Sequence, residues 1–275
     1  MLTHIDFQSM AIVIGALVLA AGLAGFLAGL FGIGGGAIYV PVLYQLYQWL
    51  EVSEGVAMHL AVGTSIAIIV PTSVRSLYAH LSRDAVDRKL LKEWCIAVPA
   101  GSIAGAFLAA SASSVTLRAI FAVLAFAISL KLLFGRITWK LGDDLPGLAG
   151  RSVTGVLIGF FSALIGIGGG VLNNTFMTLY NRPMIQAVAT SAGVGALIAI
   201  PGVATYIFSG LGDPLLPPFS LGYVSLTTLA VVAPMSLIAV PFGATLAHKL
   251  PRRTLEIGFG IFLIVVAVRF AISLS

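Results

Sequence analysis

The stretch Gly32-Ile33-Gly34-Gly35-Gly36 returns later in the chain as Gly166-Ile167-Gly168-Gly169-Gly170. Each copy interrupts a long apolar run, and each lies near the start of one half of the sequence. A cluster of glycines inside an apolar run breaks a helix and lets another backbone or a ligand come close. The repeat therefore predicts two related halves, each with a broken helix at the corresponding place.

The composition of the chain indicates whether these halves fold in water or in a membrane. Hydrophobic residues make up 59% of the chain, charged residues make up 9%, and the mean hydropathy is +1.07. Apolar runs of membrane-spanning length recur throughout, so we expect an all-α polytopic membrane protein in contact with the lipid bilayer. The net charge is +5, but the bases are scattered over short loops and form no dense patch. This pattern indicates topology and lipid headgroup contacts, and we expect no nucleic-acid partner.

Five apolar segments can be recognised in each half, in the same order. We expect a first transmembrane repeat over residues 1–135, a cytoplasmic connector over 136–149 and a second repeat over 150–275. The second segment of each half is too short to cross a hydrocarbon core of about 30 Å comfortably, at roughly 1.5 Å per residue. The expected segments cover residues 10–31, 37–50, 57–80, 91–111, 116–135, 150–165, 171–181, 186–209, 222–247 and 255–274.

The charges of the loops fix an orientation. The loops at 51–56, 112–115 and 210–221 contain no Lys or Arg, whereas the loop after the third segment, the central connector and the loop before the last segment are basic. Lys and Arg concentrate in cytoplasmic loops, so ten passes with both termini outside account for all of them. Five passes per half is an odd number, and the second half must then enter from the opposite side. We therefore predict two inverted repeats related by a pseudo-two-fold axis in the membrane plane.

The glycine clusters are the first candidate binding groups. A helix that begins just after each cluster presents unpaired backbone N–H groups and the positive end of its dipole, which together can hold a small anion. Under inversion the two clusters approach each other from opposite sides. The alternative is that the small residues only allow close helix packing. The candidate glycines are Gly32, Gly34, Gly35 and Gly36 in the first half and Gly166, Gly168, Gly169 and Gly170 in the second.

Hydroxyl pairs occupy equivalent places early in the two third segments, Thr64-Ser65 and Thr190-Ser191. Their hydroxyl groups can donate to an oxyanion without adding charge. The alternative for each one is a bond back to the carbonyl four residues earlier in its own helix.

Asn173 and Asn174 follow the second glycine cluster, where the first half has Tyr39 and Val40. Amides are costly to bury without partners, so we expect them to serve the binding site. Arg75 is a candidate for the same site because a charge inside a membrane is a functional hypothesis by default. It lies toward the inner end of its segment, however, and can instead reach the membrane surface.

Catalytic and metal-binding patterns are missing from the sequence. The four histidines are scattered singly, Cys95 is the single cysteine, and no nucleophile elbow or zinc-binding helix motif occurs. We therefore expect a protein that is not an enzyme and needs no cofactor and no metal.

The motifs as a set resemble the sulfite exporter TauE/SafE family. The resemblance is carried by Gly29-Leu30-Phe31 before the first glycine cluster, by Ala61-Val62-Gly63-Thr64-Ser65, and by their second-half counterparts, including Ala189-Thr190-Ser191. It covers nearly the whole chain. It implies a multi-pass permease of the cell inner (plasma) membrane, built from two halves, that exports a small sulfur-containing anion such as sulfite or an organosulfonate. A homodimer is a further possibility.

These patterns lead to one principal hypothesis and two alternatives. We expect an anion transporter that works by alternating access around the glycine clusters and the Thr-Ser pairs. The alternatives are a permease for another small anion or metabolite, and a non-transporting membrane scaffold subunit. A scaffold has no need of paired helix breaks, so the repeat favours transport.

Overall fold

The computed structural model describes residues 7–31, 36–135, 140–247 and 249–274. The described residues form ten α-helices and one short hairpin, in the order of the expected segments, so the all-α polytopic fold is confirmed. The helices are α1 (Phe7–Phe31), α2 (Gly36–Trp49), α3 (Glu54–Leu81), α4 (Arg88–Ser111), α5 (Ser114–Phe134), α6 (Leu148–Ile165), α7 (Gly170–Leu179), α8 (Met184–Gly210), α9 (Leu226–Ala247) and α10 (Arg252–Ile272). The strands are β1 (Ser220–Leu221) and β2 (Val224–Ser225), which pair antiparallel.

Most of these helices can cross a bilayer. In the described part of the chain, α3, α4, α5, α6, α8, α9 and α10 are each long and apolar enough to do so. The chain is therefore a multi-pass membrane protein. Of these seven spans, α3 and α8 are the most buried inside the protein, and the other five expose more of their surface.

The glycine motifs coincide with the ends of helices. α1 ends at Phe31 and α2 begins at Gly36, while α6 ends at Ile165 and α7 begins at Gly170. α2 has 14 residues and α7 has 10. At roughly 1.5 Å per residue both fall short of a hydrocarbon core of about 30 Å. The prediction of a short second helix in each half, beginning at a glycine motif, is therefore correct.

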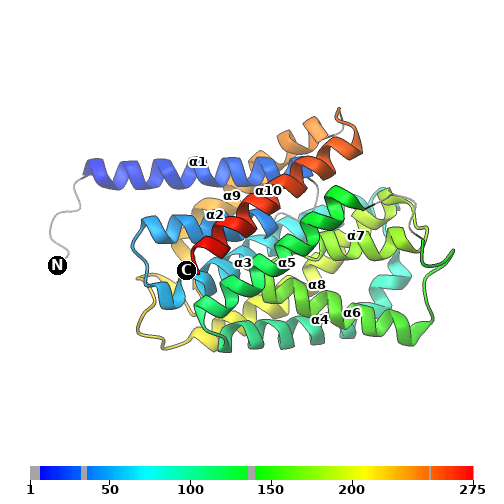
Figure 1. Ribbon diagram of the computed structural model, residues 1–275, viewed down its shortest axis with the longest axis horizontal. Coiled ribbons are helices and arrows are strands. Elements are labelled where there is room, and N and C mark those ends of the chain that lie inside the picture. The colour runs from blue at the N-terminus through cyan, green and yellow to red at the C-terminus, as the bar shows by residue number, and fades with distance from the viewer. Residues whose placement is uncertain (1–6, 32–35, 136–139, 248, 275) are drawn as a thin grey trace.

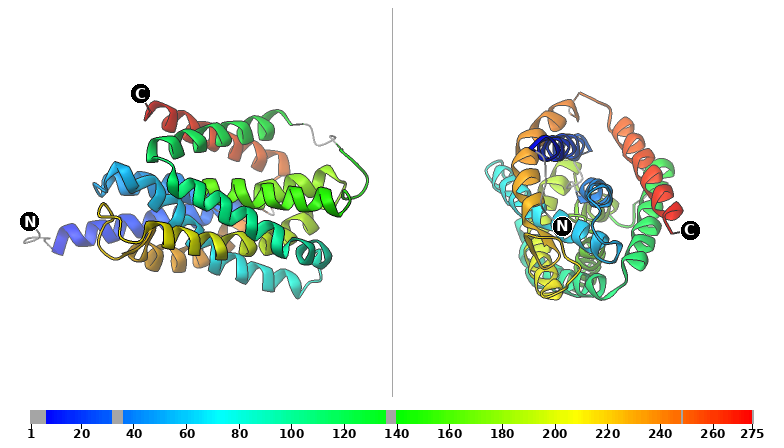
Figure 2. Two further views of the ribbon diagram at one scale, coloured as in Figure 1. Left: turned by 90° about the horizontal axis from the view of Figure 1, so that it is seen from below. Right: turned by 90° about the vertical axis from the view of Figure 1, so that its left-hand side faces the viewer.

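The helices pack in a few dominant pairs (Figure 1). α3 lies against α8, α1 against α9, α4 against α6, and α5 against α10. Figure 2 shows α10 (red) running alongside α5 (green) on one flank of the bundle. Each pair joins a helix of the first half to a helix of the second, so the two halves are intermingled throughout.

The set of helix pairs stays the same when the two halves are exchanged. If α1 corresponds to α6 and α4 to α9, then the pair α1–α9 becomes the pair α6–α4 when the halves are exchanged. The α3–α8 and α5–α10 pairs each map onto themselves. Inversion of the second half stays a prediction, and this pairing agrees with it.

The bundle has two chemically different ends. We call the end that carries β1 and β2 the hairpin end; there α10 stops and α3 begins, and its loops are the ones without Lys or Arg (Figure 1). The opposite end carries residues 140–147 and is called the connector end. At the connector end Arg182 forms an ion pair with Asp144 at 2.6 Å, and Arg151 forms one with Glu93 at 2.5 Å.

Glycines let α4 and α6 approach at backbone distance. A Cβ added at Gly101 would overlap the carbonyl oxygen of Val156, one at Gly105 would overlap that of Phe160, and one at Gly159 would overlap that of Val98. Between helices in lipid there is little hydrophobic drive to associate, so association depends on such close van der Waals contact. The packing interpretation of glycine therefore applies to this helix pair.

We predict that Gly101→Ala lowers the free energy of unfolding of the detergent-solubilised protein by about 1–3 kcal/mol, because the new methyl group forces the two helices apart. Thermal melting of the purified protein measures the effect. Gly22→Ala is the matched control, since an added Cβ at this position in α1 meets nothing within 4 Å. Equal melting temperatures for the two variants would contradict the close packing.

Candidate functional site

The two glycine motifs meet through their backbones at the centre of the bundle. A Cβ added at Gly36 would overlap the carbonyl oxygen of Gly166 and would lie 2.8 Å from Cα of Ile167. The same carbonyl oxygen accepts a hydrogen bond from Oγ of Ser65 at 3.0 Å. The start of α2, the middle of α3 and the end of α6 are therefore fixed to one another at Gly166.

The second motif turns the chain with two left-handed glycines. Gly166 has φ +72° and caps the C-terminus of α6, and Gly169 has φ +73° and precedes α7. Residues with a Cβ avoid this region of backbone conformation, which explains glycine at both places. A Cβ at Gly169 would also lie 2.6 Å from Cδ1 of Ile198 in α8.

Free hydrogen-bond donors gather where α7 begins. No side chain caps the N-terminus of α7, so the N–H groups of its first turn have no partner within the helix. Ser162 is fully buried at the end of α6, and its Oγ has no hydrogen-bond partner among the described residues. This Oγ lies 3.8 Å from the Cβ position of Gly169. The hydroxyl and the helix N-terminus together can receive a small anion.

A buried amide and hydroxyl cluster connects α7 to α8. Nδ2 of Asn173 donates to Oγ of Ser191 at 2.7 Å, and Oγ of Ser191 donates to Oδ1 of Asn174 at 2.7 Å. Oδ1 of Asn173 is left without a partner in the described part of the structure, although Asn173 is fully buried. The cluster thus holds polar atoms in an apolar interior, and one of them is available to a ligand.

The threonines of the two Thr-Ser pairs have a different role from the serines. Oγ1 of Thr64 accepts from the N–H of Ser225, immediately before α9, and Oγ1 of Thr190 accepts from the N–H of Asp87, immediately before α4, each at 3.0 Å. Both partners are N-caps: Oγ of Ser225 accepts from the N–H of Thr228, and Oδ1 of Asp87 accepts from the N–H of Leu90. Each threonine therefore holds the start of a helix from the other half.

The structure thus divides the residues predicted from the sequence into groups. It brings Gly36, Ser65 and Gly166 together, and it joins Asn173, Asn174 and Ser191. Arg75 is exposed and lies ten residues from Ser65 along α3, about 15 Å by the helical rise, so it lies away from the glycine contact. Gly32, Gly34 and Gly35 lie outside the described residues. Gly168 and Gly170 are buried in the second motif.

The central residues are closed off from both ends of the bundle. Thr64, Ser65, Asn173 and Thr190 have no exposed surface, and Asn174 and Ser191 are each 7% exposed. No Asp or Glu is buried in the part of the chain that the structure describes. The centre therefore offers neutral donors and backbone N–H groups and no competing negative charge. In the described part of the chain, no cluster of three His, Cys, Asp or Glu side chains could hold a metal ion.

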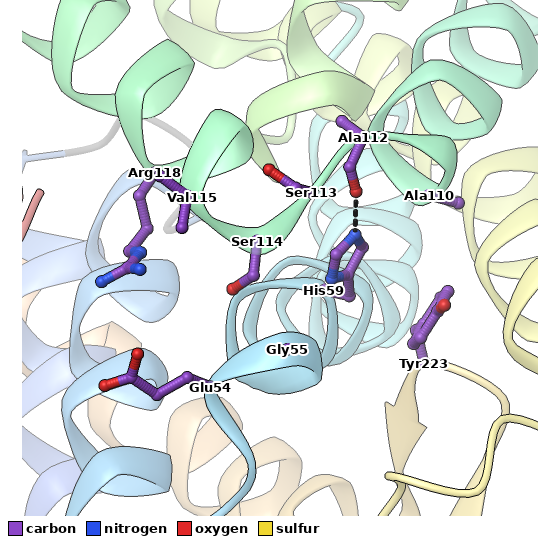
Figure 3. Close-up of a pocket in the computed structure, with 10 residues that line it drawn as sticks. All are labelled: Glu54, Gly55, His59, Ala110, Ala112, Ser113, Ser114, Val115, Arg118 and Tyr223. Carbon is purple, nitrogen blue, oxygen red and sulfur yellow. Dashed lines mark hydrogen bonds between the residues drawn. The ribbon is translucent and has the colours of Figure 1, made fainter.

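A second polar site lies at the hairpin end and is not singled out by the sequence patterns. Arg118 in α5 is 5% exposed and lines a cavity of about 330 Å³ with His59, Ser114 and Tyr223 (Figure 3). Nε2 of His59 donates to the carbonyl oxygen of Ala112 at 2.9 Å, and the imidazole ring stacks on that of Tyr223 with centroids 4.9 Å apart. Arg118 lies inside the expected segment 116–135, where it reads as one charge among apolar residues. The available signal was its position next to loops that carry no other base.

The Tyr223 phenol stays neutral in this setting. Tyr223 lies in the hairpin between β1 and β2, and its O–H donates to Oδ2 of Asp213 at 3.1 Å. Burial, followed by the Asp213 carboxylate, raises the pKa of the phenol above its ordinary value. The wall of the cavity at Tyr223 therefore carries no charge of its own at neutral pH.

In this multi-pass bundle two short helices start at paired glycine motifs, and the start of α2 lies against Gly166 of the second motif. Broken helices at corresponding places in two halves are typical of transporters. The model of the family described as sulfite exporter TauE/SafE matches residues 17–270. The chain belongs to this family, and the resemblance found in its motifs is confirmed.

Individual relatives agree with this assignment. A probable membrane transporter protein of Haemophilus influenzae is 36% identical over 256 residues, which cover 91% of this chain and 95% of that relative. A probable membrane transporter protein of Methanocaldococcus jannaschii is 25% identical, with 94% of each chain covered. The probable membrane transporter protein YunE of Bacillus subtilis is 29% identical over 70% of this chain and 78% of its own length. No solved structure matches the chain.

We predict that Thr64→Val lowers the free energy of unfolding by about 1–3 kcal/mol, because it leaves the buried N–H of Ser225 without an acceptor. Thr190→Val has a smaller effect, since Asp87 is only partly buried and water can reach its N–H. Thermal melting in detergent compares the variants. Thr227→Val, on the exposed side of the first turn of α9, is the control and leaves stability unchanged.

Proposed function

We propose that the protein transports a small sulfur-containing anion, such as sulfite or an organosulfonate, across the cell inner membrane by alternating access. The observation that carries the proposal is the backbone contact between Gly36 and Gly166, with a short helix starting beside it in each half. We expect the N-termini of α2 and α7 to direct their positive dipole ends toward one small volume beside this contact. The family and the names of the relatives support transport, and the resemblance to a sulfite exporter supports the sulfur-containing cargo.

The chemistry of the centre supports an anion as the cargo. Its free groups include the N–H groups at the start of α7 and the unpartnered hydroxyl of Ser162, which can donate to an anion. Oδ1 of Asn173 is also unpartnered, but it is an acceptor and can bind only a donor group of the cargo. The described residues place no carboxylate there to repel an anion or to bind a cation. A compact oxyanion can accept several such hydrogen bonds at once, as a neutral metabolite with few acceptors cannot.

The burial of the centre supports alternating access. Because Ser65 and Asn173 have no exposed surface, a ligand can reach them only after the bundle opens. The α1–α9 and α4–α6 pairs flank the central α3–α8 pair and exchange with each other under the proposed inversion. An opening movement of one pair at one end then has a counterpart in the other pair at the opposite end. In the orientation that the loop charges favour, the hairpin end faces outward and export proceeds toward it.

A transport assay with Gly36→Ala tests the proposal. The added methyl group overlaps the carbonyl oxygen of Gly166 and separates the two motifs. We expect sulfite efflux from proteoliposomes to fall by at least about tenfold, which corresponds to about 1.4 kcal/mol in the barrier.

Gly22→Ala is the matched control, because an added Cβ there meets nothing within 4 Å, and its efflux should equal that of the wild type. Monodisperse elution of Gly36→Ala in detergent shows that the variant is folded. Wild-type efflux from folded Gly36→Ala would overturn the proposed central site. Absence of sulfite and sulfonate efflux from the wild-type protein itself would overturn the cargo.

A further inference from the structure

Arg118 is a buried cation at the end of the bundle whose loops carry no base. It is 5% exposed, and its Nη1 donates to the hydroxyl of Tyr44 at 3.0 Å and to the carbonyl oxygen of Ser273 at 3.1 Å. Both partners are neutral, and no side-chain ion pair of Arg118 occurs among the described residues. A buried charge is costly unless something compensates it.

Two residues with unused donors line one cavity. Nε of Arg118 and Oγ of Ser114 are buried, and both are without a hydrogen-bond partner in the described structure. Both residues line the cavity of about 330 Å³ at the hairpin end, together with the first turn of α5 (Figure 3). The N-terminus of α5 adds the positive end of a helix dipole, although Oγ of Ser113 already accepts from the N–H of Thr116 at 3.1 Å. The residues that carry a guanidinium, a hydroxyl and a helix N-terminus therefore line one side of a volume that is large enough for a small solute.

We propose that this cavity is a binding site for a small oxyanion, held by Arg118 Nε, Ser114 Oγ and the N-terminus of α5. The oxyanion supplies the negative charge that Arg118 lacks and accepts the hydrogen bonds that the two side chains leave unmade. A planar guanidinium is suited to the oxygen atoms of a sulfite, sulfonate, carboxylate or phosphate group.

Other titratable groups face the site and tune it. Glu54, at the start of α3, is exposed and lines the cavity, and Figure 3 shows its carboxylate on the same side as the Arg118 guanidinium. No ion pair between the two is formed, so the carboxylate repels an incoming anion without neutralising Arg118. His59 and Tyr223 form the opposite wall, and Asp213 reaches it through the phenol of Tyr223.

The position of the cavity connects it to the centre. Glu54, Gly55 and His59 line the cavity, and Ser65 lies six residues further along α3, about 9 Å by the helical rise. If the proposed transport is correct, the cavity is the place where the anion is held at the hairpin end before or after it passes the glycine contact. Binding itself does not depend on transport and is measured separately.

The test is sulfite binding by the purified protein in detergent, read as an increase in melting temperature against sodium chloride at equal ionic strength. We expect the wild-type protein to show the increase and Arg118→Gln to lose at least about tenfold in affinity, because a hydrogen bond to a charged group is removed. Because Arg118 also ties α5 to Ser273, its variant can lose stability for a structural reason.

Two milder variants resolve that ambiguity. Ser114→Ala removes a hydroxyl that has no protein partner, so it leaves the ligand-free melting temperature unchanged and weakens sulfite binding about three- to tenfold. Glu54→Gln removes the repelling carboxylate and strengthens binding about two- to fivefold. Ser111→Ala and Glu51→Gln, which are exposed and do not line the cavity, are the matched controls and bind as the wild type does.

Sulfite binding by the wild type and by the two milder variants decides whether the cavity is an anion site. Absence of a sulfite-dependent increase in the wild type, or unchanged affinity in both Ser114→Ala and Glu54→Gln, overturns the site. An increase obtained with phosphatidylglycerol in the micelles but not with sulfite assigns the cavity to a lipid headgroup and also overturns it. Failure of the central transport site leaves these binding results unaffected, because they are measured without transport.

Discussion

The contact between Gly36 and the carbonyl oxygen of Gly166 governs the geometry of the whole bundle. No side chain fits between the two backbones, and Ser65 donates to the same oxygen, so three helices are positioned by one peptide group. From this point α2 and α7 run as short helices, α2 packed on α3 and α7 packed on α8. The remaining pairs, α1–α9, α4–α6 and α5–α10, pack around this centre.

Glycine serves three different physical purposes in this chain. At Gly36 it allows two segments of backbone to touch, at Gly166 and Gly169 it allows a left-handed turn, and at Gly101 it lets two lipid-facing helices approach. The first two purposes belong to the broken helices and create free N–H groups in an apolar interior. The third is a packing device that lipid-embedded helices need because they gain little from hydrophobic association. Sequence alone shows the glycines but does not distinguish these purposes.

The ten helices and the two short ones among them could be predicted because hydropathy and glycine clusters are local signals. The partners of the helices could not be predicted, since most of the chain separates α1 from α9 and nothing in either helix identifies the other. The different roles of the two residues in each Thr-Ser pair could not be predicted for the same reason. Thr64 and Ser65 are neighbours in sequence, but their hydroxyl groups bond to different segments of the chain. The role of Arg118 could not be predicted, because it depends on burial, which a linear pattern of charges does not reveal.

The bonds from Thr64 to Ser225 and from Thr190 to Asp87 have a consequence for how the protein is made. Each half completes the start of a helix in the other, and α1 finds its main partner only in α9. During synthesis the early helices therefore enter the bilayer long before their partners emerge from the ribosome. Their exposed glycine faces must be shielded in that interval by lipid or by the insertion machinery. Final assembly waits for the last third of the chain, so a chain truncated before α9 lacks the partners of α1 and Thr64.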